Sequence, residues 1–324
     1  MTKFVNRLVE VGIGKESSKG TGVAATYWLP KTALTFDDKV NRAMTESSYG
    51  HITDAAMTGY VTSEWAEGDI EGEINVNSFG LILLALCGTD TPTLLETGVY
   101  SHDYTLPNNV TGTSLSIHLK DPVGSSNFRM AMINSLKIDI AVGKIATFVA
   151  NFISKVHQDE TAPTASYQID KRFIGSDLIF KVANDTGLLS AATAISLKNF
   201  NIEIAKSVGK IDVLGTLEPE DIIIKGFKIK GSLELNYEDR TWRDYMLNNT
   251  VKAVEIKLVC PKLLGATQFP TLDMVFPKVM FDAWEKKGGL GDIAAQNINF
   301  EVYFDLANTR LWSTLQLING VSSY

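Results

Sequence analysis

Residues 68–88 read GDIEGEINVNSFGLILLALCG, and the hydrophobic period changes in the middle of this stretch. In its first part apolar and polar residues alternate, which is typical of a β-strand with one buried face. From Phe79 onward the apolar residues recur at helical spacing, which predicts a short amphipathic helix. Asn77 or Ser78 can cap the first free N–H groups of this helix, and Gly88 can end it. The stretch therefore predicts a strand that leads into a helix packed on a sheet.

The same order recurs in the second half, where residues 229–249 read IKGSLELNYEDRTWRDYMLNN. When Gly72 is aligned with Gly231, the apolar positions of the two strands and of the two helices coincide. Asp239 or Thr241 is the expected cap of the second helix. Both halves continue with a run of further strands, so we expect a duplicated domain, although any two strand–helix units share some of this pattern.

The chain has 324 residues, of which 45% are apolar and 21% charged, a composition that allows two globular domains of about 150 residues each. Residues 158–166, QDETAPTAS, are polar, contain proline and lack periodicity, as a linker does. We expect a first domain with an N-terminal arm at residues 1–157, a linker at 158–168, and a second domain with a C-terminal tail at 169–324.

The net charge of −7 argues against a protein that grips nucleic acid, because such binding depends on Lys and Arg neutralising phosphates. The N-terminus has no apolar core of a signal peptide. The longest apolar run, residues 79–87, is far shorter than the roughly 20 residues of a spanning helix. These features predict a soluble protein made in a cytoplasm, without membrane contact.

No pattern of residues predicts catalysis. Cys87 and Cys260 lie far apart in apolar surroundings and are expected to be reduced core thiols. The Gly-rich arm at residues 12–22 lacks the Ser or Thr that must follow the Gly-Lys pair of a phosphate-binding loop. The four histidines lack metal-ligand spacing, and His118 is expected on the solvent-facing side of a strand. We therefore expect no enzyme, no metal and no cofactor.

Further strands are expected throughout the chain, with a first strand at residues 32–40. Residues 134–142 and 146–153 alternate on both sides of a Gly-Lys turn and predict an antiparallel hairpin. Residues 41–67 are polar and irregular, which favours a long functional loop, or else a hairpin, because alternation begins near Tyr60. The C-terminal residues are short, apolar and expected to be free to pair with a neighbour.

The order and spacing of several stretches resemble the major tail tube proteins of long-tailed bacteriophages, in the two-domain form. These stretches are VGIGKESSKGTGVAATYWLP (11–30), the opening stretch with VYSH (99–102), NSLKIDIAVGKIATFVANFISK (134–155), and KGSLELNYEDRTWRDYML (230–247) with GGL (288–290) and NFEVYFD (299–305). The resemblance implies a mainly β protein with two similar sandwich or barrel domains in tandem. Each domain would carry a short flanking α-helix and contribute strands to a barrel shared around a ring.

The resemblance also implies a function. Three copies would form a pseudo-sixfold homotrimeric ring, and stacked rings would make the tail tube through which double-stranded DNA passes without sticking. The partners would be the tape measure protein in the lumen and the tail terminator and distal tail proteins at the ends. The protein would assemble in the host cytoplasm and reside in the virion tail.

The candidate lumen-lining residues lie on the polar faces of the two repeated strands, although the same faces could point outward to solvent. They are Glu71, Glu73, Asn75, Ser232, Glu234 and Asn236. Contacts between rings are expected from the N-terminal arm, residues 41–67 and the C-terminal tail. The candidate contact residues are Lys15, Glu16, Tyr49, His51 and Tyr60. The alternative is a glycan- or protein-binding β-sandwich of the baseplate or receptor-binding apparatus, for which Tyr49 and Tyr60 are the only candidate loop aromatics.

Overall fold

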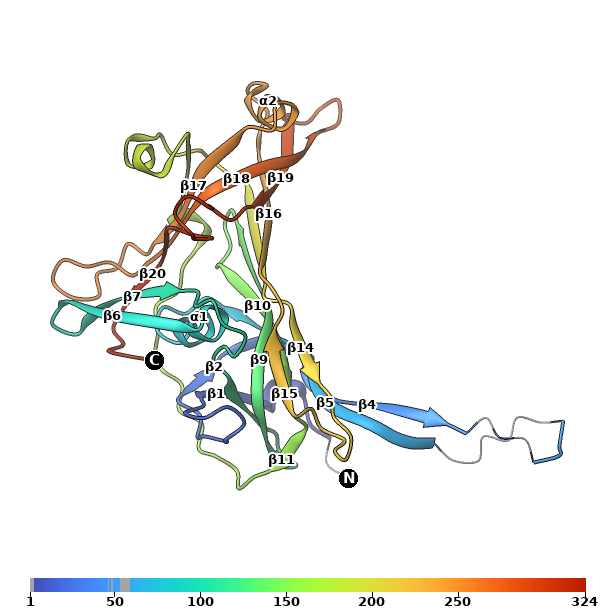
Figure 1. The fold of residues 1–324 in the computed structure, drawn as a ribbon. Helices are drawn as coiled ribbons and strands as arrows, with labels where there is room; N and C mark the ends of the chain where they lie inside the picture. The colour runs from blue at the N-terminus through green and yellow to red at the C-terminus, as the bar shows by residue number, and fades with distance from the viewer. Residues whose placement is uncertain (1–2, 46, 48, 53–58) are drawn as a thin grey trace.

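The computed structural model describes residues 3–45, 47, 49–52 and 59–324 and is mainly β, as predicted (Figure 1). The elements of the first half are the 3-10 turn η1 Asn6–Leu8, β1 Glu10–Lys15, β2 Tyr27–Leu29, β3 Lys31–Leu34, β4 Asp37–Met44, β5 Gly59–Glu73, α1 Phe79–Cys87, β6 Thr89–Glu96, β7 Val99–Thr105, β8 Leu115–Lys120, β9 Ser125–Ala141, β10 Thr147–Ser154 and β11 His157–Asp159.

The second half begins after an irregular segment. Its elements are η2 Gly175–Asp177, β12 Leu178–Ala183, η3 Thr186–Ala191, β13 Asn199–Ala205, β14 Val208–Ile211, β15 Asp221–Ile224, β16 Lys228–Asn236, α2 Thr241–Leu247, β17 Val251–Val259, β18 Thr271–Lys287, β19 Ala295–Val302 and β20 Thr314–Asn319. The predicted strand-to-helix units are present in both halves, as β5 with α1 and β16 with α2.

Helix α1 is a core helix, and the prediction that it is amphipathic was wrong. All nine of its residues are buried, because chain segments from both halves enclose it. Neither predicted capping side chain is used. Instead the carboxylate of Asp170, from beyond the linker, accepts hydrogen bonds from the backbone N–H of Asn77 (2.6 Å) and Ser78 (3.4 Å). Gly88 ends the helix with a φ of 99°, as predicted.

Helix α2 is far more exposed than α1. Trp242 is its one buried residue. Asp239, one of the two predicted caps, accepts a hydrogen bond from the backbone N–H of Thr241 at 2.9 Å. The two helices therefore occupy matching places along the chain but differ in how much of the protein covers them.

The two halves share one antiparallel sheet. In the first half β5 pairs with β10 and β10 with β9, and in the second half β16 pairs with β19 and β19 with β18. The register of the two halves also matches. In the first half Phe148 on β10 pairs with Gly72 and Ile138 on its two neighbouring strands. In the second half Phe300 on β19 pairs with Gly231 and Phe281 in the same way. Strand β13 pairs with both β16 and β9 and so joins the halves edge to edge. The division at residues 158–168 stays a prediction.

Residues 41–44 and 59–67 belong to the two strands of a hairpin, which corresponds to the alternative prediction for residues 41–67 and not to a long irregular loop. Strands β4 and β5 pair from Asp37↔Glu67 to Met44↔Gly59, and the hairpin projects away from the body (Figure 1). The expected first strand at 32–40 is divided between β3 and β4. A second hairpin, β14 with β15, packs at the base of the first, where the backbone N–H of Glu64 donates to the carbonyl of Leu217 at 2.9 Å.

The C-terminal residues are not free to pair with a neighbour, contrary to the prediction. Strand β20 pairs with β18 and with β7, so it bridges the two halves. Its alternation buries Leu315 and Leu317 in a core that includes side chains from both halves. Cys87 and Cys260 are buried free thiols, as predicted. Within the described residues no helix has the length and apolarity needed to cross a membrane.

Candidate assembly surfaces

One face of the shared sheet is buried and the other is polar. The pairing places Glu71, Val149, Lys137, Glu203, Lys230 and Glu301 in one row across six strands. Acidic and basic side chains alternate along much of this row, and Glu301 forms ion pairs with Lys228 (3.1 Å) and Lys230 (3.8 Å). Opposite charges on neighbouring strands stabilise a sheet modestly. We call this surface, on strands β5, β10, β9, β13, β16, β19 and β18, the polar face.

Four of the six predicted lumen residues lie on the polar face. Glu71 and Glu73 come from β5, and Ser232 and Glu234 come from β16. Side-chain amides of β13 bind this part of β16: Asn201 donates to Ser232 Oγ at 2.7 Å, and Asn199 donates to the Glu234 carboxylate at 2.8 Å. The other edge of β13 pairs with β9 of the first half. The two repeated strands therefore contribute to one surface.

The other two predicted lumen residues lie at the end of that surface. Asn75 is buried and forms a β-bridge with Arg172, whose guanidinium also pairs with the carboxylate of Glu73. Asn236 is exposed at the end of β16. Burial of Asn75 follows from the chain segment beyond the linker, which crosses the end of β5.

Sequence reasoning missed the middle of the polar face. Lys137, Asp139, Asn201 and Glu203 lie between the two strands that were singled out. Their alternation was recognisable, and Lys137 and Asp139 form an ion pair at 3.0 Å. Alternation identifies the polar side of each strand, but it does not say that β9 and β13 are neighbours.

The predicted contact residues of the N-terminal arm have different environments. Lys15 is exposed, and its ammonium donates to the backbone oxygen of Tyr324 at 3.0 Å. Glu16 is buried, and its carboxylate accepts hydrogen bonds from the hydroxyls of Ser114 (2.6 Å) and Ser116 (3.0 Å) and from the backbone N–H of Met130 (2.9 Å). Glu16 therefore holds the arm inside the fold and is not proposed further as a contact residue.

The remaining predicted contact residues are exposed. Tyr49 and His51 lie in the segment between β4 and β5, and Tyr60 on β5 is 66% exposed. Val40 and Met44 on the facing strand are also exposed apolar side chains. The described part of this hairpin thus presents apolar side chains that the other described residues leave exposed.

His118 is buried, contrary to the prediction of a surface histidine. Its Nδ1 lies 2.8 Å from the Glu160 carboxylate, and its Nε2 lies 2.7 Å from the carbonyl oxygen of Val23. Both ring nitrogens therefore lie within hydrogen-bond distance of an oxygen atom. The N-terminal arm covers the strand face on which His118 lies, which is why alternation alone misplaced it.

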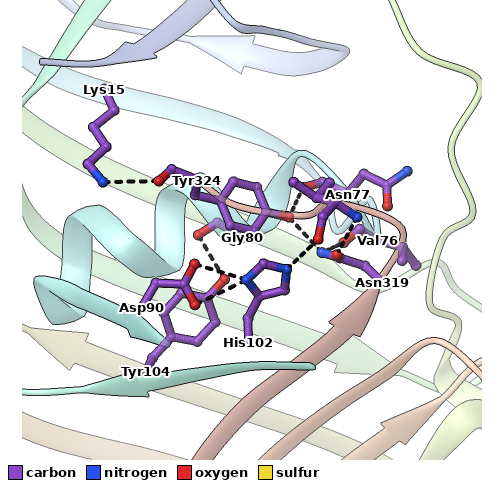
Figure 2. A network of polar contacts seen from close by, with 10 residues as sticks. Lys15, Val76, Asn77, Gly80, Asp90, His102, Tyr104, Asn319 and Tyr324 are labelled. Carbon is purple, nitrogen blue, oxygen red and sulfur yellow. Dashed lines mark hydrogen bonds and ion pairs between the residues drawn. The ribbon is translucent and has the colours of Figure 1, made fainter. Parts of the chain in front are cut away.

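A second buried histidine holds the C-terminal segment (Figure 2). His102 Nδ1 lies 2.9 Å from the carboxylate of Asp90, and its Nε2 lies 2.8 Å from the carbonyl oxygen of Val321. The hydroxyl of Tyr324 donates to the carbonyl of Asn77, next to the start of α1. A Cβ on Gly80 would lie 2.2 Å from the Tyr324 ring, so the close approach requires glycine at this position.

The second half also provides a charged group at each end of α1. At the carboxyl end Lys206 is fully buried and donates to the carbonyl of Ala85 at 2.7 Å. Desolvation lowers the pKa of Lys206 from 10.5 to about 8. Burial raises the pKa of the neighbouring Cys87 thiol well above its ordinary value. Desolvation likewise raises the pKa of Asp170 at the amino end, against the effect of its backbone hydrogen bonds. An acid at the start and a cation at the end match the helix dipole.

The described residues contain no group of three His, Cys, Asp or Glu side chains that could hold a metal ion. The family model described as "Phage tail tube protein" matches residues 6–302. None of the curated proteins compared with this chain matches it. The family match covers nearly the whole chain, and it favours the tail tube prediction over the glycan-binding alternative.

Proposed function

Since the chain belongs to the phage tail tube protein family, we propose that three copies close into a ring and that stacked rings form the channel for genomic DNA. The protein is a structural component of the virion tail. The finer points of this proposal are ring closure, the lining of the channel and the contacts between rings, and each has its own support in the geometry.

The pairing of β9 with β13 inside the chain supports the proposal of ring closure. Strand β13 lies beside β16 in the second half, and β3 has the corresponding place beside β5 in the first half. In the same way, β18 lies beside β19 in the second half, and β9 has the corresponding place beside β10 in the first half. The outer edges of the shared sheet are β3 and the carboxyl-terminal part of β18. They are the counterparts of β13 and β9, which are paired with each other inside the chain. Open edges of this kind pair with other chains. A second copy can place its β3 edge beside β18, and repetition of that contact closes a ring.

The polar face is the best candidate for the channel wall. Its opposite face is covered by the helices and the core, so only this face remains for the lumen of a barrel. Lysines such as Lys137 and Lys230 lie beside acids, which leaves few free cations to hold phosphates. Passing DNA would therefore meet a polar, charge-balanced wall with no strong binding site.

The exposed β4–β5 hairpin supports contact between stacked rings, with Tyr49, His51 and Tyr60 as contact residues and Lys15 on the N-terminal arm as a further one. Exposed apolar side chains on a projecting hairpin gain stability when a neighbour covers them. The tape measure protein in the lumen, and the terminator and distal tail proteins at the two ends, complete the proposed set of partners.

The test of ring closure is electron microscopy of the purified protein together with mass measurement of the assembled species. We expect stacked rings with a central channel and a ring mass of three chains. Monomers at all concentrations, or open filaments without a channel, would contradict the proposal.

The test of the channel wall uses tubes of Glu71→Lys/Glu234→Lys, with Glu71→Gln/Glu234→Gln as the matched control. The lysine variant should retain short duplex DNA at low salt in a nuclease-protected form, because bound DNA would lie inside the tube. The glutamine variant should not. DNA that binds the lysine tubes but is fully digested would place these residues on the outside.

A further inference from the structure

The 3-10 turns η1 and η2 occupy corresponding places in the two halves. Turn η1, Asn6–Leu8, comes just before β1, and η2, Gly175–Asp177, comes just before β12. Strand β1 pairs with β8 and β8 with β9, while β12 pairs with β17 and β17 with β18. The residues that precede η1 are therefore the counterparts of those that precede η2.

The residues before η2 form a wedge in the first half. Phe173 is fully buried; its N–H donates to the carbonyl of Ile74 at 3.4 Å, and its carbonyl accepts from the N–H of Ala146 at 2.9 Å. Arg172 forms a β-bridge with Asn75 at the same place. The N–H of Ile74 still donates directly to the carbonyl of Ala146 at 2.9 Å, and the wedge separates the two strands beyond this bond, beside the start of α1. It thereby ties the second half to the first.

The residues before η1 have the same chemistry but a different environment. Lys3, Phe4 and Val5 stand where the second half has Arg172, Phe173 and Ile174, when both are counted back from the turn. Phe4 is 48% exposed and Val5 is 63% exposed, whereas Phe173 is fully buried. Two adjacent apolar side chains in water gain stability from any matching site that covers them.

In the described part of the chain, no segment separates the two strands at the matching site in the second half. Where the wedge would lie, β16 and β19 pair directly as far as Asn236↔Ala295. A pocket of about 260 Å³ adjoins this end of the sheet and is lined in part by Leu235, Asn236, Trp242 and Tyr245. Asn297, which pairs with Glu234 and does not line this pocket, has a buried side-chain oxygen without a hydrogen-bond partner among the described residues. The amino-terminal end of α2 thus lacks the cover that the wedge gives to α1.

We propose that Lys3–Val5 of one copy inserts at the end of β16 and β19 of the next copy, as Arg172–Ile174 inserts at the end of β5 and β10 within the chain. The inference rests on the proposed ring, in which the contact from the second half to the next first half repeats the contact inside the chain. The amino terminus and α2 lie at opposite ends of the molecule (Figure 1), so the occupant is a second copy and not the same chain.

Insertion replaces backbone hydrogen bonds between β16 and β19 by hydrogen bonds to the inserted segment. The last pairs of the β16–β19 ladder part, and the inserted backbone bonds to both strands, as Phe173 does in the first half. Lys3 then lies beside Glu234, the counterpart of Asn75, which adds an opposite-charge pair. Phe4 takes the buried place that corresponds to Phe173.

Disulfide trapping in assembled tubes tests the contact. The variant Lys3→Cys/Glu234→Cys should give reducible species of two and three chains, because bridged residues on neighbouring strands are close enough for a disulfide. The variant Asn75→Cys/Arg172→Cys is the positive control and should cross-link within one chain. Lys3→Cys/Val123→Cys, with the second cysteine on an exposed turn, is the negative control. Native Cys87 and Cys260 are buried.

The outcomes separate the insertion from the ring itself. Tubes that form without cross-links between chains, or that cross-link equally well in the negative control, would overturn the insertion and leave the ring intact. A failure of the wild-type chain to form rings would overturn both. A second measurement is the protein concentration needed for ring formation. Phe4→Ala should raise this concentration at least tenfold, whereas Phe4→Leu should bring it back to the wild-type value. Leu290→Ala, at a fully exposed loop position, should leave it unchanged.

Discussion

Lys206 couples the second half to the end of α1 and makes stability depend on pH in a defined way. Its side chain is fully buried, and its ammonium donates to the carbonyl of Ala85 at 2.7 Å. Desolvation lowers its pKa from 10.5 to about 8. Because the unfolded chain binds this proton more tightly than the folded chain, the cost of burying the charge is fully present below pH 8. The cost is relieved as pH rises toward 10.5.

The magnitude follows from the two pKa values. Between pH 7 and pH 10 the relief amounts to about 2.5 kcal/mol in the free energy of unfolding. The variant Lys206→Met has no charge to bury, so its stability lacks this pH dependence, although the Ala85 carbonyl loses the Lys206 donor. The stability of the wild type minus that of Lys206→Met should therefore rise by about 2.5 kcal/mol from pH 7 to pH 10.

The assay is urea unfolding of the monomeric protein at several pH values, followed by fluorescence. Cys87 changes stability in the opposite direction, because burial raises the pKa of its thiol and the unfolded chain loses that proton first. Its effect is common to both proteins and cancels in the difference. Lys206→Arg, which stays charged at pH 10, is a second control and should show no such rise in stability with pH. A difference between wild type and Lys206→Met that stays constant from pH 7 to pH 10 would refute the reasoning.

Three further predictions concern the buried contacts of the first half. Gly80→Ala should displace the Tyr324 ring and lower the free energy of unfolding by about 1–3 kcal/mol, as measured by urea unfolding. The C-terminus should also become more sensitive to carboxypeptidase, and equal protection in both proteins would contradict the contact. Asp170→Ala should cost about 1–2 kcal/mol by uncapping α1, whereas Asp159→Ala, at an exposed site, should cost almost nothing; equal costs would argue against the cap. His118→Gln should lower stability by about 2 kcal/mol and expose the N-terminal arm to proteolysis, and an unchanged cleavage rate would show that His118 does not hold the arm.

The amino-acid sequence by itself determined the local elements. Alternation predicted β5, β9, β10, β13 and β16, because the two faces of a strand differ by one residue and burial selects one of them. The change of period at Phe79 predicted α1, and Gly88 predicted its end. The repeat of this unit, together with the order of the surrounding stretches, was enough to suggest the family that the model match then showed.

The tertiary structure alone decided which strands are neighbours and which side chains are covered. No local pattern states that β13 lies beside β9, so the continuity of the polar face across the two halves could not be predicted. Glu16 and His118 were expected on the surface, yet the N-terminal arm, which carries Glu16 and the Val23 carbonyl that faces His118, folds over β8. The cap of α1 comes from Asp170, about 90 residues away. Such contacts depend on the packing of distant segments, whereas periodicity reports only the two sides of a single element.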